Sequence, residues 1–296
     1  PSAGSSGRSE SGKEGAGPAM SRQPATFRLG ELAIEGCSRA GEETWFRVSP
    51  PGLAFDVGRG PLTLAGVRDL FVTHGHLDHV LGLPYLLSRR ALDHPWGRRV
   101  FCPAEIADDL AALVKVAERL ERTQYPFTLC PLAPGDRVEV GRDLQVEAFA
   151  TDHVVPSLGY HLLRHRYRLR EELRELAPEE VVARKRAGEA VEERSEERWL
   201  TFCGDTGPSI FTREPALFAS RVLMLECTFL DPSHRERAGR FGHLHLADLA
   251  AVEERFENEA VILYHLSRRH RPADLRRQVD ALLPRLAPRV HVLLEG

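Results

Sequence analysis

Thr73-His74-Gly75-His76-Leu77-Asp78-His79 is the stretch of sequence that points most directly to a fold. It comes immediately after Asp69–Val72, a short apolar run that predicts a β-strand. In an extended loop the first two histidines point the same way, while a turn at Asp78-His79 presents a second pair of ligands. Three histidines and one aspartate within six positions, directly past the end of a strand, therefore predict a site that can hold two metal ions.

The donor set indicates which metals fit. Imidazole and carboxylate without thiolate suit zinc, and manganese or iron are also compatible. A glutamate in place of His76 would indicate a di-iron redox site, so the histidine favours hydrolytic zinc chemistry. Three histidines in ordinary core or surface roles are the alternative, but chance gives the spacing HxHxDH only about once per thousand such chains.

Further candidate ligands follow other predicted strands. Taken alone, each would be an ordinary polar loop residue, but all of them share a position just past the C-terminal end of a strand. They are Asp152 and His153 after Leu144–Phe149, Asp205 after Trp199–Cys203, and His265 after Ala260–Tyr264. We interpret Cys203, two residues before Asp205, as a buried thiol rather than a ligand.

The rest of the chain alternates short β-rich runs with amphipathic helical patterns. The helical patterns cover about Ala104–Arg122, Leu246–Phe256 and Ala273–Leu283. The remaining predicted strands are Phe27–Ile34, Thr44–Val48, Leu53–Asp56, Arg99–Cys102, Arg137–Val140, Val222–Leu225 and Val290–Leu293. Two strand-rich halves, each followed by helices, predict an α/β fold with helices packed on the outside of two stacked sheets.

Two segments stand apart from this pattern. Residues 1–24 contain no Leu, Ile, Val or aromatic residue, so we expect a disordered N-terminal tail there and one domain over residues 25–296. Arg164–Arg198 carries ten basic residues against ten glutamates. Such a run is typical of a solvated helical insertion, and the alternative is a protruding arm that touches a partner.

Composition excludes several classes of protein. The 296 residues carry 40 Lys and Arg against 43 Asp and Glu, and 42% are hydrophobic, which excludes collagen-like, coiled-coil and wholly disordered chains. No apolar run approaches the roughly 20 residues of a membrane-spanning helix, so no membrane partner is expected. Five scattered cysteines without a CxxC pair are atypical of a disulfide framework and favour a reducing cytoplasm.

The ordered set THGHLDH, TDH, CGDT and HLSRRH resembles the metallo-β-lactamase superfamily. The segments EGCSRAGEETWFRVSPPGLAFDVGR, LMLECTFLD, GHLHLADL and ENEAVILYHLSRRH are most similar to its tRNase Z (RNase Z) branch, in the short, plant-type form. The similarity covers nearly everything from Ile34 to Gly296, and the ECTF, GHLH and HLSRRH elements are its more specific part. It implies an αββα four-layer sandwich, a hydrolase domain over residues 25–296, and endonucleolytic removal of 3′ trailers from pre-tRNA.

The resemblance also implies roles for residues at matching positions, and it implies a homodimer. One Zn²⁺ would be held by His74, His76 and His153, and a second by Asp78, His79 and His265, with Asp205 as the bridge. Ser267 and Arg269 would face the substrate phosphate. His243 would act near the leaving group, and Glu226 is the acidic residue of the ECTF segment.

Three features depart from the family pattern. His270 stands where an aromatic residue is usual, and His245 is an additional histidine. The glycine- and proline-rich arm that clamps tRNA in many bacterial members is not visible, and the charged segment Arg164–Arg198 lies in its place. These departures concern the mode of tRNA binding more than the chemistry.

The implied reaction is two-metal hydrolysis of a phosphodiester. Two zinc ions roughly 3.5–4 Å apart would lower the pKa of a bridging water and clamp the attacking and leaving oxygens. Asp78 could hold metal and accept the proton of the water, because a carboxylate has a spare oxygen. His243 could protonate the departing 3′ oxygen, and Arg269 could offset charge on the phosphate. The tRNA side would then keep a 3′-hydroxyl.

Alternatives remain for the substrate. A metallo-hydrolase of small phosphodiesters or related esters is favoured if Arg164–Arg198 does not clamp RNA. A non-catalytic scaffold is disfavoured by the intact ligand set. The stretch Ser267–Arg289 has seven Arg against two Asp, which suits either a phosphate backbone or a solubilising helix face. Trp96, Tyr125 and Phe127 could stack on bases or belong to the core or rim.

Overall fold

The computed structural model describes residues 24–93 and 97–293. The predicted N-terminal tail therefore lies almost wholly outside the described residues, and so does Trp96. Among the described helices, none is long and apolar enough to cross a bilayer.

Two seven-stranded sheets lie face to face, and each follows the chain from one edge to the other. The first contains β1 (Ala25–Leu29), β2 (Leu32–Arg39), β3 (Glu43–Ser49), β4 (Leu53–Phe55), β5 (Asp69–Phe71), β6 (Arg98–Pro103) and β7 (Phe127–Leu132). The second contains β8 (Arg137–Gly141), β9 (Leu144–Ala150), β10 (Leu158–Leu169), β11 (Glu192–Phe202), β12 (Val222–Glu226), β13 (Ala260–Tyr264) and β14 (Val290–Val292). In both sheets the first four strands are antiparallel and the later ones parallel.

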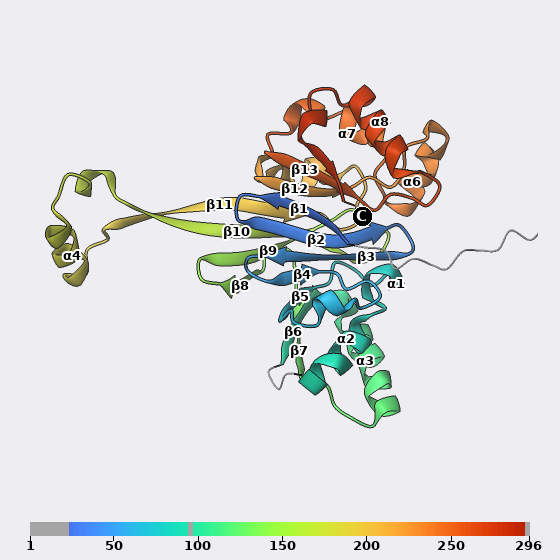
Figure 1. The fold of residues 1–296 in the computed structure, drawn as a ribbon, viewed down its shortest axis with the longest axis horizontal. Coiled ribbons are helices and arrows are strands. Elements are labelled where there is room, and N and C mark those ends of the chain that lie inside the picture. Colours follow the sequence, from blue (N-terminus) through green and yellow to red (C-terminus); the bar gives the residue numbers. More distant parts are fainter. Residues whose placement is uncertain (1–23, 94–96, 294–296) are drawn as a thin grey trace, which may run out of the picture.

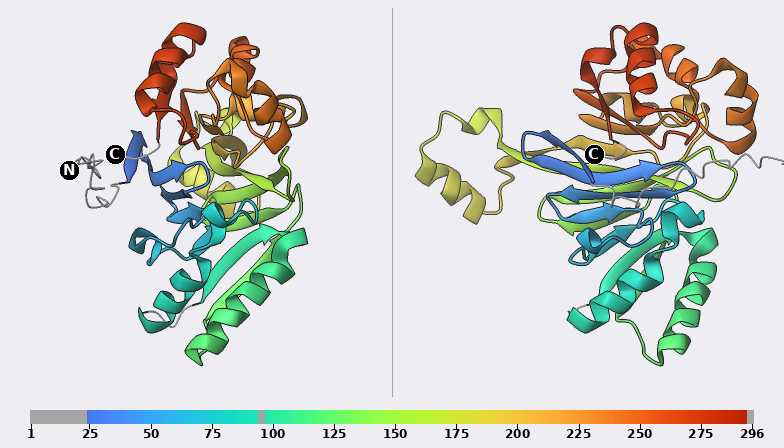
Figure 2. Two further views of the ribbon diagram at one scale, coloured as in Figure 1. Left: turned by 90° about the vertical axis from the view of Figure 1, so that its right-hand side faces the viewer. Right: turned by 45° about the vertical axis from the view of Figure 1, so that its right-hand side comes forward.

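Helices cover the two outer faces (Figures 1 and 2). The first sheet is covered by α1 (Leu77–Val80), α2 (Leu83–Asp93) and α3 (Ala107–Glu121). The second is covered by α5 (Ile210–Arg213), α6 (Arg235–Phe241), α7 (Leu246–Ala250) and α8 (Pro272–Leu282). This α/β/β/α arrangement confirms the four-layer sandwich that the sequence predicts.

Successive side chains along a central strand point to opposite faces of the sheet and so enter two different cores. Phe55 lies between the sheets, where its ring centroid is 4.8 Å from that of Phe202. Its neighbour Ala54 points the other way, into the smaller core beneath α2 and α3. Because adjacent side chains of a strand enter different cores, both faces of the central strands must be apolar. Tyr125 and Phe127 belong to this smaller core or pack against it, so the structure favours packing over base stacking.

Several predicted boundaries are wrong. Phe27–Ile34 is not one strand but the hairpin of β1 and β2, because Gly30 adopts a φ of +59° and turns the chain. The helix predicted over Leu246–Phe256 ends at Ala250 and is followed by a 3₁₀ turn. α2, α6 and β7 were not predicted, since their apolar residues are short runs interrupted by charges or prolines.

The charged insertion forms a long arm rather than a helical lobe (Figure 1). β10 and β11 run on beyond the sheet as a two-stranded ribbon, and only its tip is helical, in α4 (Pro178–Arg186). Opposite charges also meet across the ribbon, since the side chain of Arg166 on β10 pairs with Glu197 on β11 at 2.7 Å. We call residues 164–198 the arm.

Candidate metal centre

The loops after five strands meet at one edge of the sandwich. β5 leads to His74 and His76, and α1, which follows directly, carries Asp78 and His79. In the second sheet, β9 leads to His153, β11 to Asp205 and β13 to His265, while β12 ends at Glu226. The structure thus brings all seven predicted ligand residues together.

One group consists of His74, His76, His153 and Asp205, whose ligand atoms all lie within 4.8 Å of one another. His76 Nδ1 lies 3.1 Å from His74 Nε2 and 3.3 Å from His153 Nε2. The three imidazoles therefore converge on one point, with Asp205 Oδ2 at 3.8 Å from His74 Nε2.

A second group consists of Asp78, His79 and His265. Asp205 Oδ2 lies 3.4 Å from His79 Nε2 and 3.3 Å from His265 Nε2. The same carboxylate oxygen therefore borders both groups, which agrees with the bridging role that the family resemblance implies for Asp205.

Hydrogen bonds behind the histidines aim their rings. His79 Nδ1–H donates to Asp56 at 2.8 Å, and Asp56 also accepts from the backbone N–H of Thr73. His153 Nδ1–H donates to the carbonyl of Gly242 at 2.9 Å. Each bond holds Nδ1 away from the centre and turns Nε2 toward it, the orientation that metal-binding histidines require.

Asp56 was missed by the sequence prediction. It ends a predicted strand, and a buried carboxylate at an apolar strand end is a signal that could have found it. Asp56 and His265 both adopt a positive φ, of +54° and +62°, where non-glycine residues are strained. Strain at two site residues shows that surrounding contacts, not local preference, set their positions.

The surroundings of the centre favour the neutral form of three of its histidines. Burial lowers the pKa of His74 well below its usual value, and burial also lowers the pKa of His76 and His153. Burial acts the same way on His79, but Asp205 and Asp56 outweigh it and raise the pKa of His79 well above the usual value. Burial opposes ionisation of Asp205, yet His265 and His79 hold its pKa well below the usual range.

The centre contains polar atoms that need a further partner. His79 Nε2, His265 Nε2 and Asp205 Oδ1 are buried and have no hydrogen-bond partner among the described residues. Buried atoms of this kind are rare in folded proteins because each is costly. Nitrogen and oxygen donors without thiolate suit Zn²⁺, so the residues present fit the metal. Burial raises the pKa of the Cys203 thiol, and the metal-binding groups found among the described residues contain no cysteine.

Glu226 and His243 form a pair beside both groups. His243 Nδ1 lies 2.8 Å from Glu226 Oε1 and 4.0 Å from Asp205 Oδ2. Burial disfavours the imidazolium, but Glu226 outweighs burial and raises the pKa of His243 to about 9. His243 is therefore protonated at neutral pH, and its side chain remains 14% exposed.

The two unusual histidines have structural contacts. His245 caps the N-terminus of α7. Its ring Nδ1 accepts from the backbone N–H of Ala247, and the backbone N–H of His245 donates to the Asp248 carboxylate. The ring of His270 lies 5.5 Å from that of His234, centroid to centroid, and accepts from the N–H of Leu230.

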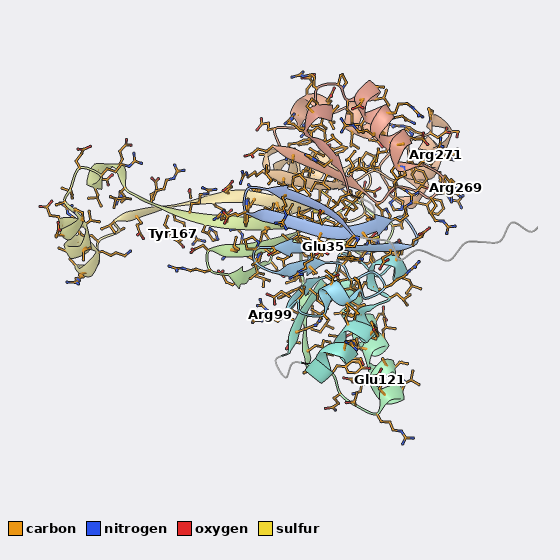
Figure 3. All side chains as sticks on the ribbon, viewed as in Figure 1. Glu35, Arg99, Glu121, Tyr167, Arg269 and Arg271 are labelled. Atoms are coloured by element: carbon orange, nitrogen blue, oxygen red, sulfur yellow. The ribbon has the colours of Figure 1, made fainter. Side chains whose placement is uncertain are left out.

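Ser267 and Arg269 lie at the rim of the centre, after β13. Ser267 is buried and accepts from the N–H of Arg269 through its hydroxyl. Among the described residues no carboxylate pairs with the guanidinium of Arg269, which is exposed at the end of the molecule opposite the arm (Figure 3).

The other arginines of the C-terminal stretch are occupied within the protein. Arg276 donates to the carbonyl of Val290 and pairs with Asp280, and Arg289 donates to the carbonyl of Phe256. The remaining pairs are Arg268 with Glu42, Arg271 and Arg277 with Asp274, and Arg285 with Glu254. These contacts favour the helix-face interpretation of this stretch over a phosphate-binding surface.

The fold and the centre define a metal-dependent hydrolase of the β-lactamase superfamily. The model of the beta-lactamase superfamily domain matches residues 54–266, a range that contains every residue of both metal-binding groups. Membership implies that this cluster binds divalent metal ions.

Curated relatives narrow the family. tRNase Z TRZ1 of Arabidopsis thaliana is 33% identical, and the match covers 89% of this chain and 95% of the relative. tRNase Z TRZ2, chloroplastic, from the same plant is 31% identical over 90% of this chain and 77% of the relative. The chain belongs to the tRNase Z family. Among solved structures, the metallo-beta-lactamase fold protein YhfI of Bacillus subtilis has the same fold, with a TM-score of 0.61 at 12% identity over 90% of this chain and 97% of YhfI.

Proposed function

We propose that the protein is a zinc-dependent endoribonuclease that hydrolyses the phosphodiester 3′ of the tRNA body and so removes 3′ trailers from pre-tRNA. The observation that supports this most is the hydrogen-bonded Glu226–His243 pair, which lies beside the two groups of metal-binding side chains and shares a cluster with Asp205 and His265. The names of the plant relatives agree with this substrate.

The two groups would each hold one Zn²⁺, and Mn²⁺ or Fe²⁺ would accept the same donors. His74, His76 and His153 form the first set, and Asp78, His79 and His265 form the second, with Asp205 between them. When bound, the two ions supply a water nucleophile of lowered pKa and offset negative charge on the phosphate.

Asp78 would orient the water and accept its proton. Burial would raise the pKa of Asp78, but His265 and His79 outweigh it and lower that pKa, so the carboxylate stays ionised. Its Oδ2 accepts from the backbone N–H of Gly41 at 2.8 Å and lies 3.6 Å from His265 Nε2, so this oxygen faces the ligand cluster.

His243 would protonate the leaving 3′ oxygen, because it alone in the pair carries a proton that can be given up near neutral pH. Glu226 would keep that imidazole charged and oriented. Arg269 and the Ser267 hydroxyl would bind the nonbridging phosphate oxygens, and the tRNA product would carry a 3′-hydroxyl.

The arm would contact the body of the tRNA. At its root a cavity of about 470 Å³ is lined by four arginines, by Glu31 and Asp143, and by Tyr167, which is 50% exposed and could stack on a base. Arg168 lines this cavity without an ion pair to a described carboxylate, whereas Arg166 pairs with Glu197 at 2.7 Å. Figure 3 shows Tyr167 at the base of the arm.

One observation favours the second candidate, a hydrolase of small phosphodiesters. The arm has ten basic residues against ten glutamates, and pairs such as Lys185 with Glu192 neutralise them within the arm itself. An arm without net charge attracts a phosphate backbone less than a basic one.

A single comparison separates the two candidates. The purified protein is incubated with a 3′-extended pre-tRNA and, separately, with bis(p-nitrophenyl) phosphate. Cleavage of the pre-tRNA at the end of the tRNA body, with a far higher kcat/KM than for the small ester, is expected. Turnover of the small ester without cleavage of the pre-tRNA would select the second candidate.

Assembly and location extend the proposal. We expect a homodimer, as the family resemblance implies. Leu77, Leu81 and Tyr85, in and around α1 and α2, are 63%, 54% and 50% exposed, as interface residues would be in a separated subunit. We expect a cytoplasmic location, because all five cysteines are unpaired, as a reducing compartment would leave them.

A further inference from the structure

Thr228, which lies two residues past the end of β12, connects groups that the proposed mechanism treats separately. It is uncharged, 2% exposed and no predicted site residue. Its hydroxyl oxygen lies 2.5 Å from Glu226 Oε2 and 3.1 Å from His265 Nδ1. Its carbonyl accepts from the backbone N–H of Ser267 at 3.0 Å.

The chemistry of His265 and Glu226 fixes the direction of the two hydrogen bonds that the Thr228 hydroxyl makes. His265 Nε2 faces the ligand cluster and must keep its lone pair to bind a metal, so the proton of this imidazole sits on Nδ1. The Thr228 oxygen accepts that proton. A carboxylate can only accept, so the single hydroxyl hydrogen of Thr228 points to Glu226.

No other described residue can replace this hydroxyl. Glu226 Oε1 is already bonded to His243 and to the backbone N–H of Thr206, at 2.8 and 2.9 Å. Thr228 is the one described partner of Glu226 Oε2 and of His265 Nδ1. Without the hydroxyl, two buried polar atoms lose their partner and both side chains lose their alignment.

We infer that Thr228 is a positioning residue that orients the ligand His265 and the Glu226–His243 pair at the same time, through one hydroxyl. No proton passes along this line. Its part in catalysis rests on the proposed function, whereas its part in metal binding does not.

The first experiment measures metal binding in Thr228→Val, which keeps the shape and removes the hydroxyl. We expect zinc affinity, measured by competition with a chromophoric chelator, to fall about 10–100-fold, the usual effect of losing the partner of a metal-bound histidine. Thr228→Ser should restore affinity. The matched control is Thr201→Val in β11, which removes an equally buried hydroxyl that lies 2.7 Å from Nδ1 of His161 in β10. This variant should bind zinc normally.

The second experiment tests the coupling to His243. With pre-tRNA, Thr228→Val should lower kcat by about 10–100-fold with little change in KM. In a His243→Ala background the same substitution should cost measurably less, because part of its effect has already been lost. Thr228→Ser should keep most of the activity.

Two results would overturn the inference: normal zinc affinity and kcat in Thr228→Val, or a serine variant as impaired as the valine variant. Failure of the proposed function looks different. In that case the unmodified protein would leave pre-tRNA uncut, while the difference in zinc affinity between the valine and serine variants would persist.

Discussion

At the scale of single residues, the proposed function gives His243 a role different from that of the seven proposed ligands. His243 Nδ1 is hydrogen-bonded to Glu226 Oε1, and the same nitrogen lies 4.0 Å from Asp205 Oδ2. It nevertheless belongs to a group of potential ligand atoms with Asp205, Glu226 and His265. Substitution decides between an acid and an eighth ligand.

His243→Ala should lower kcat on pre-tRNA by roughly 10²–10⁴-fold, the usual size of general acid catalysis. Zinc content, measured by elemental analysis, should not change. Bis(p-nitrophenyl) phosphate should be affected far less, because p-nitrophenolate departs without a proton. His79→Ala is the contrasting variant and should lose metal and both activities. Loss of zinc from His243→Ala, or equal slowing of both substrates, would make His243 a ligand or a structural residue.

Glu226→Gln should change the pH dependence. If the protonated imidazole of His243 is the acid, activity on pre-tRNA should be present below the pKa of His243 and decline as pH rises through it. The charge of Glu226 raises that pKa against the effect of burial. Its removal should therefore shift the alkaline decline of kcat/KM to lower pH. A profile that stays in place, or shifts upward, would contradict the assigned pairing.

At the scale of elements, the arm is closed by a hydrogen bond from the N–H of Arg170 to the carbonyl of Val191, just beyond the last paired residues, Leu169 and Glu192. The tip beyond this bond therefore contributes nothing to the sheets, and it can be removed without disturbing the core.

Replacement of residues 171–190 by an Asn-Gly turn should thus leave the fold and the hydrolysis of bis(p-nitrophenyl) phosphate unchanged. If the arm binds the tRNA body, KM for pre-tRNA should rise by an order of magnitude or more, with a smaller effect on kcat. Steady-state kinetics on both substrates check this. Unchanged KM for pre-tRNA would remove the arm from substrate binding.

α8 offers a second test at this scale. Arg276 ties α8 to β14 through the carbonyl of Val290, at 3.1 Å. Arg276→Gln should therefore cost about 1 kcal/mol of unfolding free energy and leave the salt dependence of pre-tRNA binding unchanged. Arg269→Gln should leave the unfolding free energy unchanged and reduce the salt dependence of pre-tRNA binding. Denaturant unfolding and binding at several salt concentrations measure the two effects. A lower salt slope in Arg276→Gln would restore the phosphate-binding interpretation of α8.

At the scale of the whole molecule, the parts that the sequence predicts are the parts encoded locally. His74, His76, Asp78 and His79 are close in the chain, and strand ends place His265 and the other ligands by a general rule of sheet topology. Asp56 and Thr228 were not predicted, since their contacts depend on how strands from distant segments come into register. The arm was predicted only as an alternative, because charge runs are usually solvated faces of an insertion.

The same centre joins the two halves of the sandwich. His79 and Asp78 follow a strand of the first sheet, whereas Asp205 and His265 follow strands of the second. The buried Nε2 atoms of both histidines have no hydrogen-bond partner among the residues that the structure describes. Bound ions should therefore stabilise the whole fold, by mass action. We expect a chelator to lower the melting temperature by on the order of 5 °C and zinc to restore it. Differential scanning calorimetry measures the shift. Asp205→Ala, which disturbs both groups, should have nearly the same melting temperature with zinc and without it. A parent protein with the same melting temperature in chelator and in zinc would show that the ions do not join the two sheets.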